Sequence, residues 1–293
     1  MATSGDDGKP GPVLVTGANG GIGLATTLRL AQRGWSVWGT VRSPAKASAL
    51  RRAAQAADAG SRVRAVVLDV SDHAAVVARW RRLPDFWAVV NNAGGALSGA
   101  VEEVSAAEAT ALLGINLVTP AVVSGCALPG MRRLGGGRIV MVSSMAGRAA
   151  VLPFHAWYHA SKFGLEALSD VLRVEVAQFG VKVSVVEPGF VRTGIEGKAE
   201  AELRRRAASD SPYAAGYART RQLTSLVDRY APSPDAVART IVSAVEGRRP
   251  RRRYLVGAEA PLVPAAALLP DELTDLVIRL VADLRGGPPA RAR

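Results

Sequence analysis

The 293-residue sequence predicts a single-domain α/β fold, a doubly wound parallel sheet of about seven strands with helices on both faces. From residue 13 onward, short runs rich in β-branched residues alternate with longer amphipathic stretches, which is the pattern of strands joined by crossover helices. A glycine-rich turn follows the first of these runs and opens the first amphipathic stretch. With 48% hydrophobic residues and no internal repeat, the chain can build one large core.

The predicted elements follow one another with clear local signals. The strand candidates, in chain order, are Val13–Thr16, Ser36–Val41, Val63–Leu68, Trp87–Asn91, Arg138–Ser143, Val181–Glu187 and Tyr254–Val256. Ser105 and Glu108 have the spacing of a capping box, and Ser233 precedes a proline at a first helical position. Residues 190–232 are polar and Arg-rich, and because ligands bind at the carboxyl ends of the strands, they predict a substrate lid. Residues 1–11 and 286–293 are expected to be flexible tails around a domain at 12–285.

The charge, cysteine and histidine content of the chain argues against nucleic-acid-binding, disulfide-stabilised and metal-dependent proteins. The net charge of +12 is concentrated in arginine runs at 204–206 and 248–253, which are commonly solvated, and no nucleic-acid-binding motif accompanies them. Cys126 is the only cysteine, so an intrachain disulfide and a cysteine-rich metal site are excluded. His155 and His159 lack a carboxylate motif, so we expect them at the surface or lining a pocket and predict no metal site. Without a targeting signal or membrane span, the protein is expected to be cytoplasmic.

The turn PVLVTGANGGIG carries Gly17, Gly21 and Gly23 between the first strand and the first helix. Glycines let backbone amides approach a pyrophosphate, and the N-terminus of the helix attracts the negative charge. The spacing GxxxGxG differs from the best-known dinucleotide fingerprint, and a glycine cluster can be a simple tight turn. Its position between a strand and a helix nevertheless favours dinucleotide binding.

The stretch YHASK places Tyr158 and Lys162 four residues apart. On a helix these side chains lie on one face, so the ammonium group would favour the phenolate form of a tyrosine whose free pKa is about 10. A solvated pair on an exposed helix is the alternative for this motif alone.

Five segments in order resemble the short-chain dehydrogenase/reductase family: TGANGGIG, Asn91 to Gly94, Ser143-Ser144, YHASK, and Pro188-Gly189 with Thr193. The resemblance covers about residues 12–195 and implies a Rossmann-like fold that transfers a hydride between a nicotinamide and a ketone or secondary alcohol.

The resemblance implies a role for each matching residue. Tyr158 would be the acid/base, and Lys162 would lower its pKa and bind the nicotinamide ribose. Ser144 would stabilise the substrate oxygen, unless it only caps a turn, and Asn116 would hold a water in a proton relay. The implied cofactor contacts are Gly17, Asn19, Gly21, Ile22, Gly23, Asp69, Val70, Asn92, Ala93, Gly94, Pro188, Gly189, Val191 and Thr193, together with Tyr158 and Lys162. Asp69 could instead cap the following helix.

The end of the second strand, SVWGTVRSPAK, addresses the choice of dinucleotide. NAD-preferring members of the family resemble one another in an acidic residue here, whereas this chain has none and offers Arg42. A guanidinium matches a phosphate by charge and geometry, so we predict NADP, with NAD as the alternative if Arg42 is only a surface residue.

Two other functions remain open at this stage: an epimerase or dehydratase of the extended relatives, and a non-catalytic dinucleotide sensor. The substrate is expected to be an apolar or aromatic carbonyl or alcohol, because Met145, Leu152, Phe154, Trp157 and Phe190 surround the motif, although each could equally be core packing. Apolar residues on more than one face of the helix after Tyr158 predict a homodimer or homotetramer.

Overall fold

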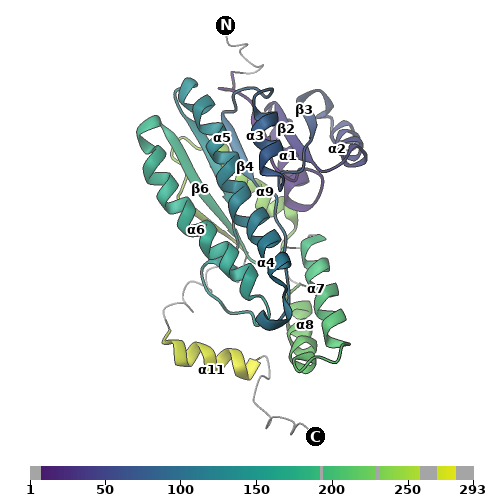
Figure 1. Ribbon diagram of the computed structural model, residues 1–293. Coiled ribbons are helices and arrows are strands. Elements are labelled where there is room, and N and C mark those ends of the chain that lie inside the picture. Colours follow the sequence, from purple (N-terminus) through teal and green to yellow (C-terminus); the bar gives the residue numbers. More distant parts are fainter. Residues whose placement is uncertain (1–7, 192–193, 229–230, 258–268, 282–293) are drawn as a thin grey trace, which may run out of the picture.

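The computed structural model describes residues 8–191, 194–228, 231–257 and 269–281. Within these ranges seven parallel strands form one sheet in the order β3-β2-β1-β4-β5-β6-β7 (Figure 1). The strands are β1 Val13–Val15, β2 Val37–Val41, β3 Val63–Val67, β4 Ala88–Asn91, β5 Gly137–Val142, β6 Val181–Pro188 and β7 Arg253–Val256. The predicted fold class is therefore confirmed, and each observed strand begins and ends within one residue of its predicted bounds.

Helices cover both faces of the sheet. The helices are α1 Gly21–Gln32, α2 Pro44–Ala56, α3 His73–Trp80, α4 Ala106–Leu113, α5 Thr119–Arg133, α6 Ala156–Val176, α7 Gly194–Ala207, α8 Ala214–Asp228, α9 Pro234–Glu246 and α11 Asp271–Val281. One core cluster packs α1, α2 and α9 on one face of the sheet, and a second packs α3, α5 and α6 on the other. Strand residues that are buried on both faces explain why these strands read as continuous apolar runs.

The order in which strands are added to the sheet reverses between β1 and β4. The strands β1, β2 and β3 extend to one side of this point, whereas β4 pairs with the other side of β1 and leads to β5, β6 and β7. Open α/β sheets bind their ligands at such a switch point, outside the carboxyl ends of the strands. The glycine turn after β1 and the segment after β4 therefore meet where the fold favours a ligand.

The local helix signals are confirmed in part. Ser105 and Glu108 form the predicted capping box at α4, and Pro234 is the first residue of α9. The Ser233 side chain, however, makes no capping hydrogen bond. Between α4 and α5 the helix widens into a π-helical turn, Gly114–Val118, which the sequence pattern does not reveal.

The helical stretch Ala106–Arg133, which joins α4 and α5, is long and apolar enough to cross a membrane by length and composition, with a mean hydropathy of 1.8. It packs against β4, β5 and α3, and it carries the buried Asn116 near its middle. Inside the fold, 39% of its apolar window is buried.

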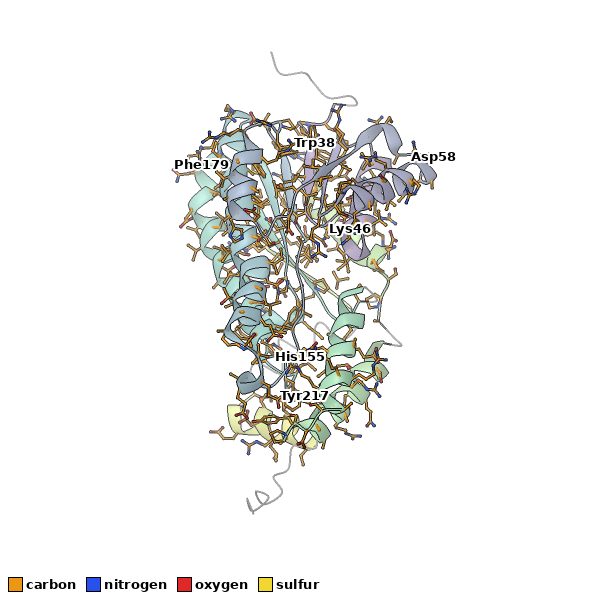
Figure 2. The ribbon with its side chains drawn as sticks, turned by 45° about the vertical axis from the view of Figure 1, so that its right-hand side comes forward. Trp38, Lys46, Asp58, His155, Phe179 and Tyr217 are labelled. Atoms are coloured by element: carbon orange, nitrogen blue, oxygen red, sulfur yellow. The ribbon has the colours of Figure 1, made fainter. Side chains whose placement is uncertain are left out.

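The segment predicted as a lid contains two helices, α7 and α8, that pack on each other beyond one end of the sheet (Figure 1). Figure 2 shows Trp38 of β2 at one end of the molecule, and His155 and Tyr217 at the opposite end. Because Trp38 lies at the beginning of its strand, the end with His155 and Tyr217 is the one toward which the carboxyl ends of the strands point.

Candidate functional site

The glycine turn after β1 is a tight backbone cradle. Gly17 has a φ of +67°, and a Cβ atom on Gly23 would lie 2.2 Å from the Gly17 carbonyl oxygen, so both positions need glycine. Gly21 also has a positive φ, +49°. Asn19 and Ile22 are half-buried within the same turn.

This cradle fits a pyrophosphate. Gly20 precedes α1 without a side-chain hydrogen bond to the helix, and no acidic residue lies in its first turn. The first backbone N–H groups of the helix are thus without a side-chain cap, and the helix dipole favours an anion there. No side chain in this turn opposes the negative charge of a dinucleotide.

Asn92 braces the cradle from the neighbouring strand. Its side-chain amide donates to the carbonyl oxygens of Thr16 at 2.9 Å and Gly17 at 3.3 Å. The Thr16 hydroxyl in turn accepts from the backbone N–H groups of Asn92 and Ala93, both at 2.9 Å. In this structure the Asn92 side chain therefore holds the turn itself.

Arg42 and Asp69 lie at the ends of two paired strands, β2 and β3. The Asp69 carboxylate accepts from the Ser71 hydroxyl at 2.7 Å and the Ser71 N–H at 3.0 Å, and these bonds, with the nearby charges of Arg42 and Lys46, lower the pKa of Asp69. Arg42 is exposed. The N-cap of α3 is Asp72, which rules out Asp69 as the cap of that helix. The adjacent Val70 is buried in the core, so only its backbone can face a ligand.

Asn116 lies in the π-helical turn with only 1% of its surface exposed. Its amide nitrogen donates to the Gly95 carbonyl and to the Ser161 hydroxyl, both at 3.0 Å, and its oxygen accepts from the Gly95 N–H at 2.8 Å. Ser161 donates onward to the Tyr158 carbonyl at 2.7 Å. A Cβ atom on Gly94 would lie 2.9 Å from the Asn116 oxygen, so this position also needs glycine. The buried amide is thus satisfied, and it links the segment after β4 to α6.

Tyr158 and Lys162 occupy one face of α6, as predicted. The Lys162 ammonium nitrogen is 5.7 Å from the centroid of the Tyr158 ring and donates to the Val142 carbonyl at 3.0 Å. Lys162 is only 7% exposed, and its burial lowers its pKa to about 8, although the Glu166 carboxylate opposes that shift. A solvated surface pair is therefore excluded.

Ser144 follows β5 and approaches the end of β6. Its hydroxyl donates to the Pro188 carbonyl at 3.4 Å and accepts from the Ala146 N–H at 3.1 Å, capping the short helical turn η4, Met145–Gly147. Gly189 donates its N–H to Val256 at 2.8 Å, and Val191 is buried. Thr193 lies outside the described residues. Ser144 therefore caps a turn, as the alternative interpretation expected, and this hydrogen bond holds its hydroxyl at the edge of the sheet.

Neither His155 nor His159 lies at the surface, which corrects the sequence expectation: both are buried and hydrogen-bonded. His159 accepts from the Leu152 N–H at 3.3 Å and therefore donates from Nδ1 to the Ala146 carbonyl at 2.8 Å. His155 contacts Ser98 at 3.1 Å and the Pro153 carbonyl at 2.9 Å. Burial lowers the pKa of both, so they are neutral braces of the loop before α6. No cluster of metal-binding side chains occurs among the described residues.

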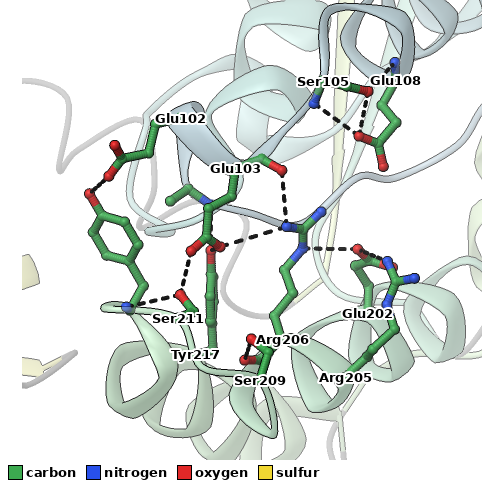
Figure 3. A network of polar contacts seen from close by, with 12 residues as sticks. Glu102, Glu103, Ser105, Glu108, Glu202, Arg205, Arg206, Ser209, Ser211 and Tyr217 are labelled. Atoms are coloured by element: carbon green, nitrogen blue, oxygen red, sulfur yellow. Dashed lines mark hydrogen bonds and ion pairs between the residues drawn. The ribbon is translucent and has the colours of Figure 1, made fainter.

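A polar network that the sequence did not predict ties the α7–α8 region to the segment before α4 (Figure 3). Tyr217 of α8 is fully buried; its hydroxyl accepts from the Ala100 N–H at 2.8 Å and donates to Glu103. Ser211 also donates to Glu103, and these two bonds lower the pKa of that carboxyl group. Arg206 reaches the Glu103 carbonyl at 3.2 Å.

Two arginines that were expected to be solvated are therefore structural. The Arg206 side chain is 12% exposed and pairs with Glu202 at 2.9 Å as well as with Glu103. Arg253 pairs with three carboxylates, of which Glu166 and Glu187 are buried. Most of the carboxylates in these ion pairs lie far from the arginines in the sequence, so the arginine runs alone do not predict the pairs.

A hollow of about 440 Å³ opens beside this network. Its lining residues are mostly apolar and are Gly99, Ala100, Val101, Glu102, Phe154, Ala156 and Tyr213. Phe154 has a positive φ of 62°, which is unusual for a residue other than glycine, and its ring packs on Tyr217 with centroids 4.4 Å apart. Of the five apolar residues singled out in the sequence, Phe154 lines this hollow, whereas Met145 is buried in the core.

Within the described residues, the predicted residues that follow β1 to β6 lie at the carboxyl ends of these parallel strands, which form one edge of the sheet. The family described as "short chain dehydrogenase" matches residues 12–204. Retinol dehydrogenase 5 of Homo sapiens is 32% identical over 287 residues, which cover 92% of this chain and 88% of that protein.

Solved structures agree with this match. A short-chain dehydrogenase from Streptomyces avermitilis is similar with a TM-score of 0.74 and 30% identity, covering 94% of this chain and 97% of its own. A metagenomic short-chain oxidoreductase in complex with NADP is similar with a TM-score of 0.66 and 27% identity, covering 84% and 96%.

Proposed function

Because the chain belongs to the short-chain dehydrogenase/reductase family, we propose that it is an NADP(H)-dependent oxidoreductase that interconverts a ketone and a secondary alcohol. The observation that carries the proposal is the pairing of Tyr158 with a buried Lys162 at the sheet edge where the glycine cradle also lies. A binding module without chemistry has no use for a desolvated lysine beside a tyrosine.

In this proposal the bound nicotinamide supplies or accepts the hydride. During reduction, Tyr158 donates its phenolic proton to the carbonyl oxygen, and the Lys162 ammonium stabilises the phenolate that results. Ser144 donates a hydrogen bond to the same oxygen as negative charge develops there. Asn116, anchored between Gly95 and Ser161, orients the water through which Tyr158 recovers its proton. In oxidation each step runs in reverse.

The cofactor would lie along the carboxyl edge of the sheet. The uncapped N-terminus of α1 would hold the pyrophosphate, and Asp69 and the backbone of Val70 would border the adenine. Arg42 is exposed at the end of β2, without an acidic residue beside it in the sequence, and would pair with a 2′-phosphate. The NADP bound by the metagenomic relative is consistent with this choice.

The substrate would be apolar. The hollow beside Phe154 and Tyr213 is lined mostly by apolar atoms and lies where α8 meets the segment before α4. Retinol dehydrogenase 5, whose name specifies an apolar alcohol, is among the similar proteins. We therefore propose that α7 and α8 form the lid predicted for residues 190–232 and that substrates enter beside it.

We also propose a cytoplasmic homodimer or homotetramer. Four apolar side chains of α6 and its neighbours are substantially exposed: Phe163, Val171, Val174 and Phe179. Burying such a surface against a second copy would remove apolar area from water. Sedimentation that shows only a 30.5 kDa species at micromolar concentration would contradict the assembly.

The deciding experiment for the function is a panel of ketones and secondary alcohols assayed with NADPH, NADH and their oxidised forms. We expect turnover of apolar members with a preference for NADP(H). Cofactor binding without turnover of any member would favour the non-catalytic alternative.

A further inference from the structure

Two buried carboxyl groups, one of them a helical turn after Lys162, lie against one nitrogen atom of Arg253. Arg253 of β7 places its Nε 3.1 Å from an oxygen of Glu166 and 3.0 Å from an oxygen of Glu187. Glu166 is 6% exposed and Glu187 is 1% exposed. Two ionised carboxylates this close, and this far from water, repel each other strongly.

The hydrogen bonds reveal an imbalance of donors. Arg253 Nε carries a single hydrogen, which it donates to Glu166 Oε2. The Nη2 group of Arg253 donates to Asp170 at 2.6 Å. Glu166 Oε1 and Glu187 Oε1 are buried and accept no hydrogen bond from any described residue. The two carboxyl groups are neighbours, because both contact the same Arg253 Nε atom, at 3.1 and 3.0 Å. One proton held between them would satisfy both oxygens and remove the repulsion.

The pair is packed directly against the groups that we place in the reaction. Glu166 follows Lys162 by one turn of α6, and a Cβ atom on Gly147 would lie 3.0 Å from Glu166 Cγ and 2.9 Å from the Lys162 carbonyl oxygen. The turn η4 therefore seals the pair from water. Glu187 immediately precedes Pro188, whose carbonyl receives the Ser144 hydroxyl.

We propose that Glu166 and Glu187 share one proton, and that the remaining negative charge, held on Glu166 one helical turn from Lys162, keeps the buried Lys162 ammonium charged. Glu166 and Glu187 are thus positioning residues that act through Lys162. The proton comes from solvent and no covalent bond other than O–H changes. The proton sharing stands independently of the activity, whereas the effect on turnover rests on the proposed function.

The charges around the pair agree with this arrangement. Arg148 of the η4 turn and Arg253 of β7 face Glu187, and Lys162 and Asp170 flank Glu166 on α6. Burial, followed by the nearby Glu166 charge, raises the pKa of Glu187 to about 7. Burial lowers the pKa of Lys162 to about 8, and Glu166 is the neighbouring charge that opposes this change. Because the single Arg253 Nε hydrogen is donated to Glu166, the proposal assigns the remaining charge to Glu166 and the proton to Glu187.

Two isosteric variants separate these roles. In Glu187→Gln the amide can donate to Glu166 and mimic the protonated acid, so the charge beside Lys162 remains. In Glu166→Gln the charge is transferred to Glu187, which is not among the charges acting on Lys162. Both variants change the formal charge equally. Asp170→Asn is the matched control, because Asp170 shares Arg253 but its side chain is 46% exposed.

The first measurement uses the full chain without cofactor. Infrared spectra should show a protonated carboxyl band in the wild type that disappears as the pH rises through about 7. The band should be absent from both glutamine variants and retained in Asp170→Asn. A wild type without such a band, or a band that persists in both glutamine variants, would overturn the proton sharing.

The second measurement follows the Lys162 ammonium by ¹³C NMR of its Cε, assigned through its loss in Lys162→Met. Glu166→Gln should lower the titration midpoint of Lys162 by about half a pH unit or more, because Glu166 is the carboxyl group whose charge acts on this ammonium. Glu187→Gln should change the midpoint by less than about 0.3 units. Equal shifts in the two variants, or none, would refute the role of Glu166.

The third measurement is the pH profile of kcat/KM for alcohol oxidation. The limb that reports deprotonation should move to higher pH in Glu166→Gln, with the KM for cofactor changed less than about twofold. If the NMR shift occurs while the profile stays fixed, the proposed role of Lys162 in turnover fails and the proton-sharing pair stands. Far-UV circular dichroism confirms that each variant is folded.

Discussion

On the cofactor side of the sheet edge, a Cβ atom on Gly23 would lie 2.2 Å from the Gly17 carbonyl, and Asn92 bonds to backbone carbonyls. On the lid side, Tyr217 reaches Ala100 and Glu103 through one hydroxyl group. The first region is fixed by close backbone packing and one neutral side-chain amide, whereas the second is fixed by side chains with titratable groups. The glycine turn is therefore held without titratable side chains, whereas the contacts of α8 depend on a few side-chain hydrogen bonds that single substitutions can remove.

The largest expected effect comes from Tyr158→Phe, which removes the proton donor and leaves both regions intact. Because general acid–base catalysis contributes about 10²–10⁴-fold, turnover should fall by at least about a hundredfold. The dissociation constant for NADPH, measured by fluorescence titration, should stay unchanged. Comparable turnover in the variant would contradict the assignment of Tyr158. Loss of NADPH binding instead would show that the Tyr158 hydroxyl is needed for cofactor binding as well as for proton transfer.

Arg42→Ala tests the cofactor side alone. The KM for NADPH should rise about tenfold or more, equivalent to about 1.4 kcal/mol, because the phosphate loses a charged partner. The KM for NADH should hardly change, since NADH lacks the 2′-phosphate. The neighbouring Lys46→Ala serves as a control for charge alone. If the wild type prefers NADH, or if Arg42→Ala treats NADPH as the wild type does, the pairing of Arg42 with phosphate is wrong.

Tyr217→Phe tests the lid side. The Ala100 N–H and Glu103 each lose a buried partner, so the free energy of unfolding should decrease by about 1 kcal/mol. The KM for the apolar substrate should rise, and the affinity for NADPH should not. Tyr213→Phe is the matched control, because its hydroxyl bonds to Glu102 at the surface. Equal losses of stability in the two variants would argue against a buried anchor at Tyr217.

The smallest effect concerns pH. Hydrogen bonds from Ser211 and Tyr217 lower the pKa of Glu103 in the folded protein below its unfolded value of about 4.3. The stabilisation by Glu103 is therefore present above that unfolded pKa and is lost as the pH falls through the folded pKa. Urea unfolding of Glu103→Gln should show a weaker decline of stability with acid than the wild type. Identical acid dependence in both proteins would mean that Glu103 does not control this anchor.

The sequence predicted the sheet closely because its signals are local. Runs of valine define strands wherever helices cover both faces, and the glycine turn at Gly17 is readable because only glycine permits that backbone. The grouping of Ser144 with Tyr158 was implied by the resemblance to the short-chain dehydrogenase/reductase family, and Tyr158 lies on α6 rather than at a strand end. The π-helical turn at Asn116 was not predicted, since a shift in the hydrogen-bond pattern leaves no trace in apolar periodicity.

The electrostatic part of the site was harder to predict for a different reason. Arg206 and Arg253 lie within arginine-rich runs whose composition indicates solvation, yet they pair with Glu103 and Glu166, which are 103 and 87 residues away in the sequence. Which arginine of such a run is buried depends on the tertiary contacts of the folded protein. The burial of His159 was missed similarly, because its partners are backbone groups of Ala146 and Leu152.

The position of Arg253 on the last strand has a consequence for biosynthesis. The cation that neutralises Glu166 and Glu187 leaves the ribosome 87 residues after Glu166, which corresponds to roughly 4–17 s of synthesis. Until β7 adds to the edge of β6, the nascent sheet would carry two inward carboxyl groups without this counter-ion. The incomplete chain would then bury this proton-sharing pair without a cation beside it, so we expect the addition of β7 to stabilise the end of β6 that carries Glu187.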